Sequence, residues 1–158
     1  PESILASSQA AWEYWQELYA NQQTPQIGIL GHSLGAAAAL QLAETISVKR
    51  VVLLSPFTSV ADMVKKMFGS WLIPLLQHRF ENRGPLMQLL KRDSPPSITI
   101  IHGTRDEVIP VEMGRQLVDL NPEQIHYHEL IHSYHNTILQ DALPKILHEI
   151  QSIRELSD

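Results

Sequence analysis

Apolar positions along the chain follow two alternating patterns. Continuous or alternating apolar runs lie at about 27–30, 50–55, 97–102 and 124–131. Short runs of this kind predict strands, and the alternation in the last run is typical of a strand nearer the edge of a sheet. Between the runs, apolar residues recur every three or four positions, as on the buried face of a helix. Strands that alternate with helices predict a mostly parallel sheet flanked by helices, which is an α/β fold.

The expected helices differ in how much of their surface is apolar. The helix that follows the first strand, at about 34–46, is apolar nearly all round and should be buried. The helices at about 1–21 and 111–120 and the one after residue 138 are amphipathic, so we expect each to cover the sheet with one face. Pro144 should interrupt or restart the C-terminal helix, because proline cannot donate a helical hydrogen bond.

Composition excludes several functional classes. The chain has 158 residues, a net charge of −5 and no cysteine. One domain of this length buries enough surface for a core. The acidic balance, without a lysine or arginine cluster, argues against nucleic-acid binding, and no apolar stretch is long enough for a transmembrane helix. The absence of cysteine excludes disulfides and a cysteine nucleophile and is compatible with a reducing compartment, so we expect a cytoplasmic protein.

The chemistry of the chain centres on the sequence Gly31-His32-Ser33-Leu34-Gly35. This G-x-S-x-G pattern stands between the first strand and a run of strong helix formers, which is the setting of a nucleophile elbow. We expect the turn to strain Ser33 and the two glycines to avoid clashes where strand and helix nearly touch. The alternative is a glycine-rich strand-to-helix turn with an incidental serine. Because both flanks match, we predict that Ser33 is a nucleophile.

A serine nucleophile needs a base to take its proton and a third group to orient that base. Asp106 and Glu107 follow the strand at 97–102, and His132 and His135 follow the last strand. Elbow-type hydrolases place serine, acid and histidine in this chain order. Of each pair, Asp106 and His135 are the preferred candidates. Glu107 is interpreted as solvated surface charge, and His132 remains a competitor for the base.

The chain resembles the α/β-hydrolase superfamily, especially small serine hydrolases of the acyl-protein thioesterase, esterase and lipase type. The resemblance rests on the elbow motif, on His102-Gly103-Thr104-Arg105-Asp106 and on His135-Asn136. It implies that Ser33 is the nucleophile, Asp106 the acid and His135 the base, and that the backbone N–H of Leu34 is an oxyanion donor. His132 and Tyr134 stand where the family has glycines before its base, so the loop is expected to differ in shape.

The resemblance covers only the second half of the usual sheet. Residues 1–158 would form a single, partial α/β-hydrolase domain without the N-terminal strands and without the earlier loop that gives the second oxyanion donor. The chain is then either a fragment of a longer protein or a form that has lost its upstream half. The strand before the elbow would be an unpaired edge. We therefore expect self-association, pairing with a missing N-terminal half, or weak stability.

The segment 57–95 lies where α/β-hydrolases insert a lid. Ser59 and Asp62 resemble a capping box at the start of one helical piece, and a second piece covers about 84–91. Its apolar side chains would suit an acyl chain or a lipid surface, although they would serve equally to pack the lid onto the body. They are Met63, Met67, Phe68, Trp71, Leu72, Ile73, Leu75 and Leu76.

These observations predict a serine hydrolase that cleaves a carboxylic ester or thioester, with a small-molecule or acyl substrate and an acyl-enzyme on Ser33. No cofactor and no metal are expected. His126 and His128 share a face with His132, but no carboxylate or cysteine ligand accompanies them, so an exposed edge-strand face is preferred over a metal site. A serine peptidase is the enzymatic alternative. A non-catalytic interaction module or inactive half-domain is the alternative from another class.

Overall fold

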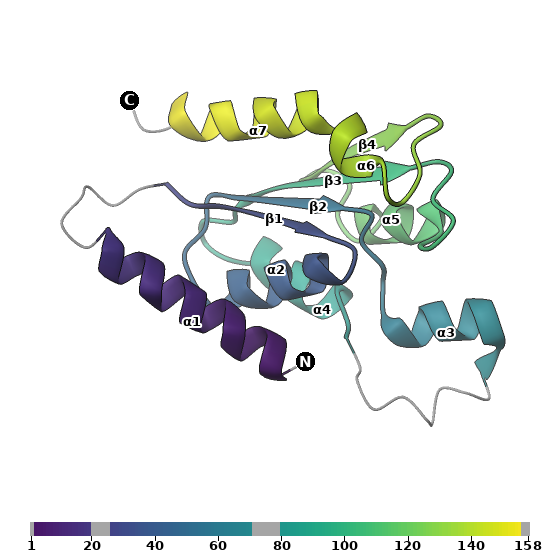
Figure 1. Ribbon diagram of the computed structural model, residues 1–158, viewed down its shortest axis with the longest axis horizontal. Coiled ribbons are helices and arrows are strands. Elements are labelled where there is room, and N and C mark those ends of the chain that lie inside the picture. The colour runs from purple at the N-terminus through teal and green to yellow at the C-terminus, as the bar shows by residue number, and fades with distance from the viewer. Residues whose placement is uncertain (1, 20–25, 71–79, 156–158) are drawn as a thin grey trace.

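The computed structural model describes residues 2–19, 26–70 and 80–155 (Figure 1). Among the described residues, no helix combines the length and apolar character needed to cross a membrane. The elements in chain order are α1 (Glu2–Leu18), β1 (Gly28–His32), α2 (Leu34–Thr45), β2 (Arg50–Leu54), α3 (Val60–Phe68), α4 (Arg83–Leu90), β3 (Ser97–Gly103), α5 (Val111–Val118), β4 (Ile125–Leu130), α6 (Ile138–Asp141) and α7 (Leu143–Glu155). The predicted strands and helices are confirmed, and the C-terminal helix restarts beside Pro144 as expected.

The four strands form one parallel sheet in the order β1-β2-β3-β4. Each strand pairs with the next strand in sequence, so the carboxyl ends of all four lie along the same edge. Helices α2 and α4 cover one face of the sheet and α7 covers the other, while α1 lies against α2 (Figure 1). The predicted α/β fold is confirmed, and the loops that carry the candidate residues meet at one edge of the sheet.

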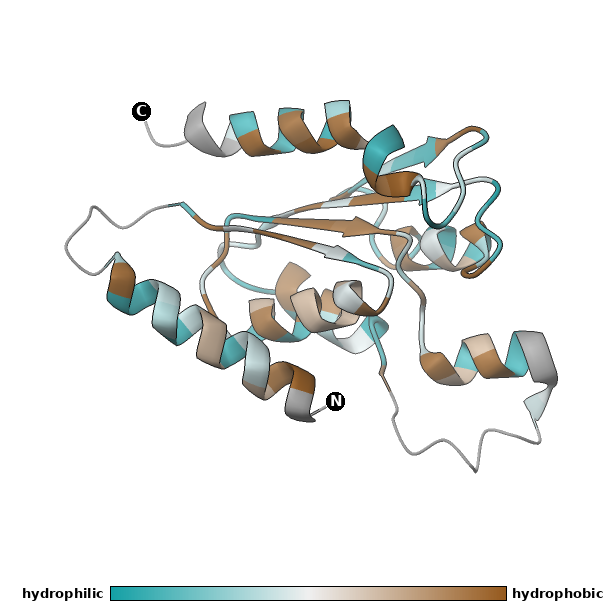
Figure 2. Ribbon diagram, viewed as in Figure 1, coloured by the Kyte–Doolittle hydropathy of each residue, from teal (hydrophilic) through white to brown (hydrophobic). Residues whose placement is uncertain are grey.

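Side chains of the central strands are buried on both faces of the sheet. Val51 and Leu53 of β2 pack with α2 and α4, whereas Val52 and Leu54 point to α6 and α7. Figure 2 shows the central strands β2 and β3 as mainly hydrophobic. Two-sided burial explains why these strands read as continuous apolar runs rather than as alternating ones.

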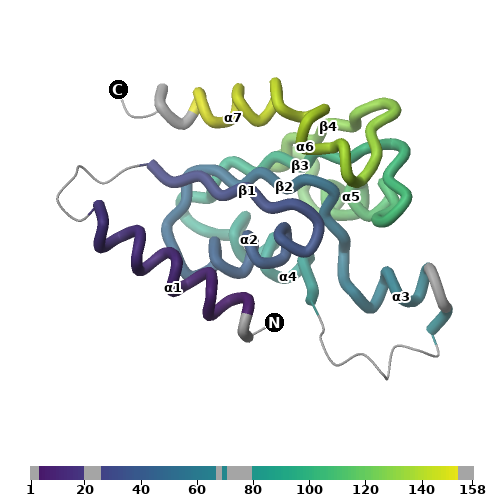
Figure 3. The backbone as a smooth tube through the Cα atoms, viewed as in Figure 1, coloured from purple at the N-terminus to yellow at the C-terminus, as the bar shows by residue number. Residues whose placement is uncertain are grey.

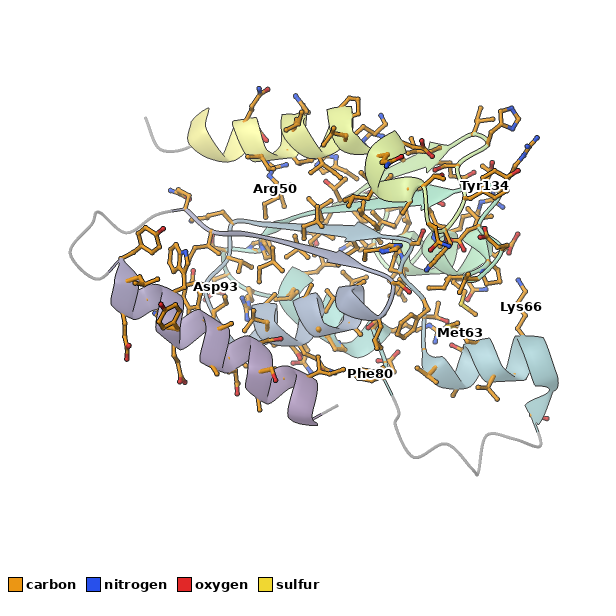
Figure 4. The ribbon with its side chains drawn as sticks, viewed as in Figure 1. Arg50, Met63, Lys66, Phe80, Asp93 and Tyr134 are labelled. Atoms are coloured by element: carbon orange, nitrogen blue, oxygen red, sulfur yellow. The ribbon has the colours of Figure 1, made fainter. Side chains whose placement is uncertain are left out.

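A buried ion pair fixes α7 to the sheet. The guanidinium of Arg50, which Figure 4 labels beneath α7, pairs with the carboxylate of Glu149. The other oxygen of that carboxylate accepts a hydrogen bond from Thr99 Oγ1 at 2.9 Å. These contacts join β2, β3 and α7, so the helix after the base loop has a fixed position on the sheet.

The segment 57–95 divides into two parts. Helix α4 belongs to the body, because Leu86 and Leu89 are fully buried in the core beside α2. Helix α3 lies at one end of the molecule (Figure 3), where Val60 and Met63 pack on a buried apolar cluster. It begins as predicted, with the Ser59 hydroxyl accepting a hydrogen bond from the Asp62 N–H at 2.9 Å. Residues 71–79, which include five of the apolar residues assigned to the lid, lie outside the described residues. A lid role therefore stays a prediction, and α4 is not part of it.

Strand β1 forms one edge of the sheet, as predicted, and this edge is unpaired within the described residues. Leu30 of β1 is 44% exposed and lines a cavity of about 320 Å³ between β1, β2 and α7. A row of half-exposed apolar side chains continues along α6 and α7. Its members are Leu139, Leu143, Leu147 and Ile150. What covers this edge, a second copy or an upstream half, stays a prediction.

Candidate active site

Ser33 stands at the turn between β1 and α2 in a strained backbone conformation. Its φ of 56° and ψ of −120° lie outside the regions that residues with a Cβ ordinarily occupy. Its backbone N–H donates to the carbonyl of Leu54 at 3.0 Å, so β2 holds the residue in place. Strain of this kind costs roughly 1–3 kcal/mol and persists only where the surrounding structure enforces it. The hydroxyl consequently lies beside the positive N-terminal end of α2.

The two glycines of the motif have different roles. A Cβ on Gly31 would lie 2.4 Å from the carbonyl oxygen of Gly35 and 2.7 Å from the Cα of Ala36, so the close approach of β1 and α2 requires glycine. A Cβ on Gly35 would meet nothing within 4 Å. The expectation that both glycines avoid a clash is therefore correct for Gly31 and wrong for Gly35, which faces open space.

Asp106 and His135 form a hydrogen-bonded pair at the carboxyl ends of β3 and β4. The imidazole Nδ1 lies 2.8 Å from Oδ2 and 3.0 Å from Oδ1 of the carboxylate. Oδ1 also accepts hydrogen bonds from the backbone N–H groups of Val108 and Ile109, at 3.0 and 2.7 Å. A carboxylate can only accept here, so Nδ1 carries the proton and Nε2 is left to act as a base.

The environment of Asp106 favours its ionised form. The side chain is fully buried. Burial alone would raise the pKa of Asp106, but the hydrogen bonds that its carboxylate accepts outweigh burial and hold the pKa well below its ordinary value. Asp106 therefore remains a carboxylate over the pH range in which histidine titrates.

His32 links the serine turn to His135, the candidate base. Its ring centroid lies 4.8 Å from that of His135, with the planes tilted by 38°. Burial, and then repulsion from His135, lower the pKa of His32, which favours a neutral ring at neutral pH. Among the described residues no hydrogen bond joins the Ser33 hydroxyl to His135. Such bonds often form only when substrate is bound.

The loop that carries His135 crosses closely over the loop that carries Asp106. A Cβ on Gly103 would lie 2.3 Å from the carbonyl oxygen of Ser133, so only glycine permits this crossing. The same carbonyl accepts a hydrogen bond from the Arg105 N–H at 3.0 Å. Gly103, the glycine of the acid motif, therefore allows the loops of Asp106 and His135 to lie close together.

Glu107 contributes to the same crossing, which the sequence did not indicate. Its carboxylate accepts a hydrogen bond from the backbone N–H of His135 at 3.3 Å. Glu107 is exposed, as expected of a surface charge, but it also makes this contact. Its side chain links the acid loop to the base loop.

A second set of contacts that sequence reasoning missed secures the base loop from its other side. The hydroxyls of Ser133 and Thr137 donate to Oδ2 of Asp141 at 2.5 and 2.6 Å. These two hydrogen bonds lower the pKa of Asp141. A Ser-x-x-x-Thr-x-x-x-Asp spacing before a helix is the one signal in the sequence that pointed to them.

His132 has the left-handed backbone conformation that glycine adopts most readily. Its φ is 70°, and its backbone N–H donates to Thr104 Oγ1 at 3.1 Å. Its side chain is exposed, and no contact between it and Asp106 occurs in the described residues. The structure thus brings His135, rather than His132, to the acid. The left-handed conformation at 132 is one that a residue with a Cβ adopts at some cost.

The fold is that of the α/β-hydrolases. An Agrobacterium tumefaciens protein of unknown function described as an α/β hydrolase superimposes with a TM-score of 0.62 at 19% identity, over 97% of this chain and 60% of that one. Zea mays acyl-protein thioesterase 2 superimposes with a TM-score of 0.58 at 17% identity, over 96% of this chain and 65% of that one. The esterase domain of a Rhodothermus marinus protein superimposes with a TM-score of 0.59 at 16% identity, over 87% of this chain and 65% of that one. These neighbours show that the chain has the α/β-hydrolase fold.

Sequence similarity points to proteins without a described activity. The uncharacterized protein Rv2307c of Mycobacterium tuberculosis is 29% identical over 126 residues, which is 80% of this chain and 43% of that protein. An uncharacterized protein of Acanthamoeba polyphaga mimivirus is 29% identical over 137 residues, which is 75% of this chain and 44% of the viral protein. No protein-family model matches the chain. The chain spans less than half the length of these curated relatives.

Proposed function

We propose that Ser33, Asp106 and His135 form the catalytic triad of a serine hydrolase that cleaves a carboxylic ester or thioester. The observation that carries the proposal is the buried Asp106–His135 hydrogen bond of 2.8 Å beside a serine with a φ of 56°. The ring contact between His32 and His135 supports it, because it puts the turn and the base side by side.

The proposed reaction uses an acyl-enzyme. Ser33 Oγ attacks the carbonyl carbon of the substrate while His135 Nε2 takes the hydroxyl proton, and Asp106 stabilises the imidazolium that forms. The tetrahedral intermediate then collapses, the carbon–oxygen or carbon–sulfur bond breaks, and His135 returns the proton to the leaving alcohol or thiol. Water, deprotonated by His135, attacks the ester on Ser33. The acid is released, and the proton goes back to the serine oxygen.

The oxyanion hole sets the expected rate. Leu34 is the first residue of α2, and the first N–H groups of a helix have no acceptor within it, so the Leu34 N–H is available to a developing oxyanion. A second donor would come from polypeptide outside the described residues, which we assign to an upstream half that pairs with β1. Loss of one such donor lowers kcat by about 10²–10³.

The substrate class is inferred from the apolar surroundings of the site. Met63 of α3 packs on a cluster that includes Phe57, Phe80 and Ile109, and Met63 and Phe80 are labelled in Figure 4. Ile109 follows the acid loop, and the cluster also includes Ala37 of α2, four residues after Ser33. An apolar cluster that joins the elbow helix to the acid loop supports an acyl group over a charged one. The thioesterase among the structural neighbours supports the same class.

Hydrolysis of a matched set of acyl esters and one acyl thioester tests this function. We expect slow turnover that is faster with a long acyl chain than with a short one, and no turnover above background for Ser33→Ala. Ser47→Ala, at an exposed position, is the control and should match wild type. Equal rates for wild type and Ser33→Ala, in folded protein, would favour the alternative of a non-catalytic half-domain, which the unpaired β1 edge supports.

A further inference from the structure

A second histidine contacts the candidate acid from inside the protein. His102 lies at the end of β3 and is fully buried. Its Nε2 lies 3.4 Å from Oδ2 of Asp106, the same oxygen that faces His135. Nothing in the proposed reaction uses this ring, although it is buried beside the reacting groups.

The contacts of His102 define its protonation. Nε2 lies 2.9 Å from the carbonyl oxygen of Ile109. A carbonyl only accepts hydrogen bonds, so Nε2 carries the proton. Nδ1 is buried and has no partner among the described residues, which makes it the unprotonated nitrogen of a neutral ring. The ring therefore directs a single N–H toward the acid loop.

Gly114 of α5 makes room for this ring. A Cβ at position 114 would lie 2.5 Å from Nδ1 of His102, so the helix packs directly on the imidazole. One side of the ring therefore packs on Gly114 of α5. Its Nε2 contacts the Ile109 carbonyl and the Asp106 carboxylate of the acid loop.

We propose that His102 is a positioning residue, whose Nε2–H anchors the Ile109 carbonyl and Oδ2 of Asp106 and so aims the carboxylate at His135. The effect of this positioning on catalysis rests on the proposed function. Oδ1 is fixed by the backbone N–H groups of Val108 and Ile109, and His102 restrains Oδ2 from within the core. The buried Ser55 hydroxyl also interacts with the Asp106 carboxylate. With both oxygens restrained, the carboxylate has one orientation before substrate arrives.

A purely structural role for His102 predicts a different response to substitution. Glutamine retains an N–H donor at about the position of Nε2, whereas leucine fills much of the volume without a donor. If the ring only packs, leucine should be tolerated as well as glutamine or better. If it positions Asp106, glutamine should restore what leucine removes.

The test is proton NMR of the His135 Nδ1–H, with fluorophosphonate labelling rates measured in parallel, on wild type, His102→Gln, His102→Leu and Gly114→Ala. We expect the His135 Nδ1–H resonance in wild type and His102→Gln. In His102→Leu we expect this proton to exchange with water roughly tenfold faster or more, and labelling to slow by about 10²-fold. Gly114→Ala keeps the histidine but displaces its ring, and should resemble His102→Leu. It decides the matter if His102→Leu does not fold.

An unchanged resonance and labelling within twofold of wild type in His102→Leu, or in Gly114→Ala where leucine unfolds the chain, would overturn the inference. The inference would also be overturned if His102→Gln lost the resonance and the labelling rate while His102→Leu retained both. The NMR signal is also recorded in Ser33→Ala, because it does not depend on a reactive serine. A signal that depends on His102, in wild-type protein that does not label, would reject the proposed function while keeping the positioning role.

Discussion

Asp106→Asn is expected to lower the rate of ester hydrolysis by about 10⁴-fold while the chain remains folded. The asparagine carbonyl can still accept from the N–H groups of Val108 and Ile109, which would leave the side-chain NH₂ facing Nδ1 of His135. Nδ1 must then accept rather than donate, so the proton moves to Nε2. A histidine in that tautomer cannot take the proton of Ser33.

Glu107→Gln is the matched control for this substitution. Glutamine keeps an oxygen that can accept from the His135 N–H, which now bonds to the Glu107 carboxylate at 3.3 Å. We expect a change of less than about tenfold, since the proton on Nδ1 is unaffected. A loss at Glu107→Gln as large as at Asp106→Asn would mean that the two acids have been assigned the wrong way round. Kinetics with one acyl ester, on both variants and wild type, checks this.

Gly31→Ala is expected to destabilise the chain strongly, although it adds only one methyl group. The added Cβ would lie 2.4 Å from the Gly35 oxygen and 2.7 Å from the Ala36 Cα, and both contacts are to backbone. Strand β1 and helix α2 must then separate, which we expect to cost about 1–3 kcal/mol of unfolding free energy or more. Because Ser33 lies in the turn that joins them, its reactivity should fall as well.

Gly35→Ala adds the same methyl group four residues later. Its Cβ would meet nothing within 4 Å, and alanine is favoured over glycine in a helix by about 0.5–1 kcal/mol. Urea unfolding of both variants should therefore give opposite signs. Equal stability of Gly31→Ala and wild type would contradict the tight approach of β1 to α2.

The strands and their parallel arrangement could be predicted from the sequence. So could the choice of Asp106 and His135 as the two side chains that meet. The apolar runs at β2 and β3 are buried on both faces, so their pattern admits few other interpretations. Asp106 and His135 follow strands that pair side by side, which brings their loops together. Proximity of these two residues therefore follows from topology.

The contacts between loops were less accessible to sequence reasoning. The hydrogen bond between Glu107 and His135 depends on one loop crossing the other at Gly103. A Cβ on Gly103 would lie 2.3 Å from the carbonyl oxygen of Ser133. The hydrophobic periodicity of a sequence predicts helices and strands, but it does not predict where two loops cross. Helix α4 was assigned to a lid because a short amphipathic helix has the same pattern whether it covers a sheet or a substrate. The position of His102 behind Asp106 likewise depends on α5, which is distant in sequence from the elbow.

Intact-mass spectrometry after fluorophosphonate treatment tests the central claim, that Ser33 is an activated nucleophile, most directly. Wild type and Ser33→Ala are treated side by side, and a cooperative melt verifies that each is folded. The proposed triad predicts a single adduct on wild type and none on Ser33→Ala. Folded wild-type protein without an adduct, or equal adducts on both proteins, would contradict it.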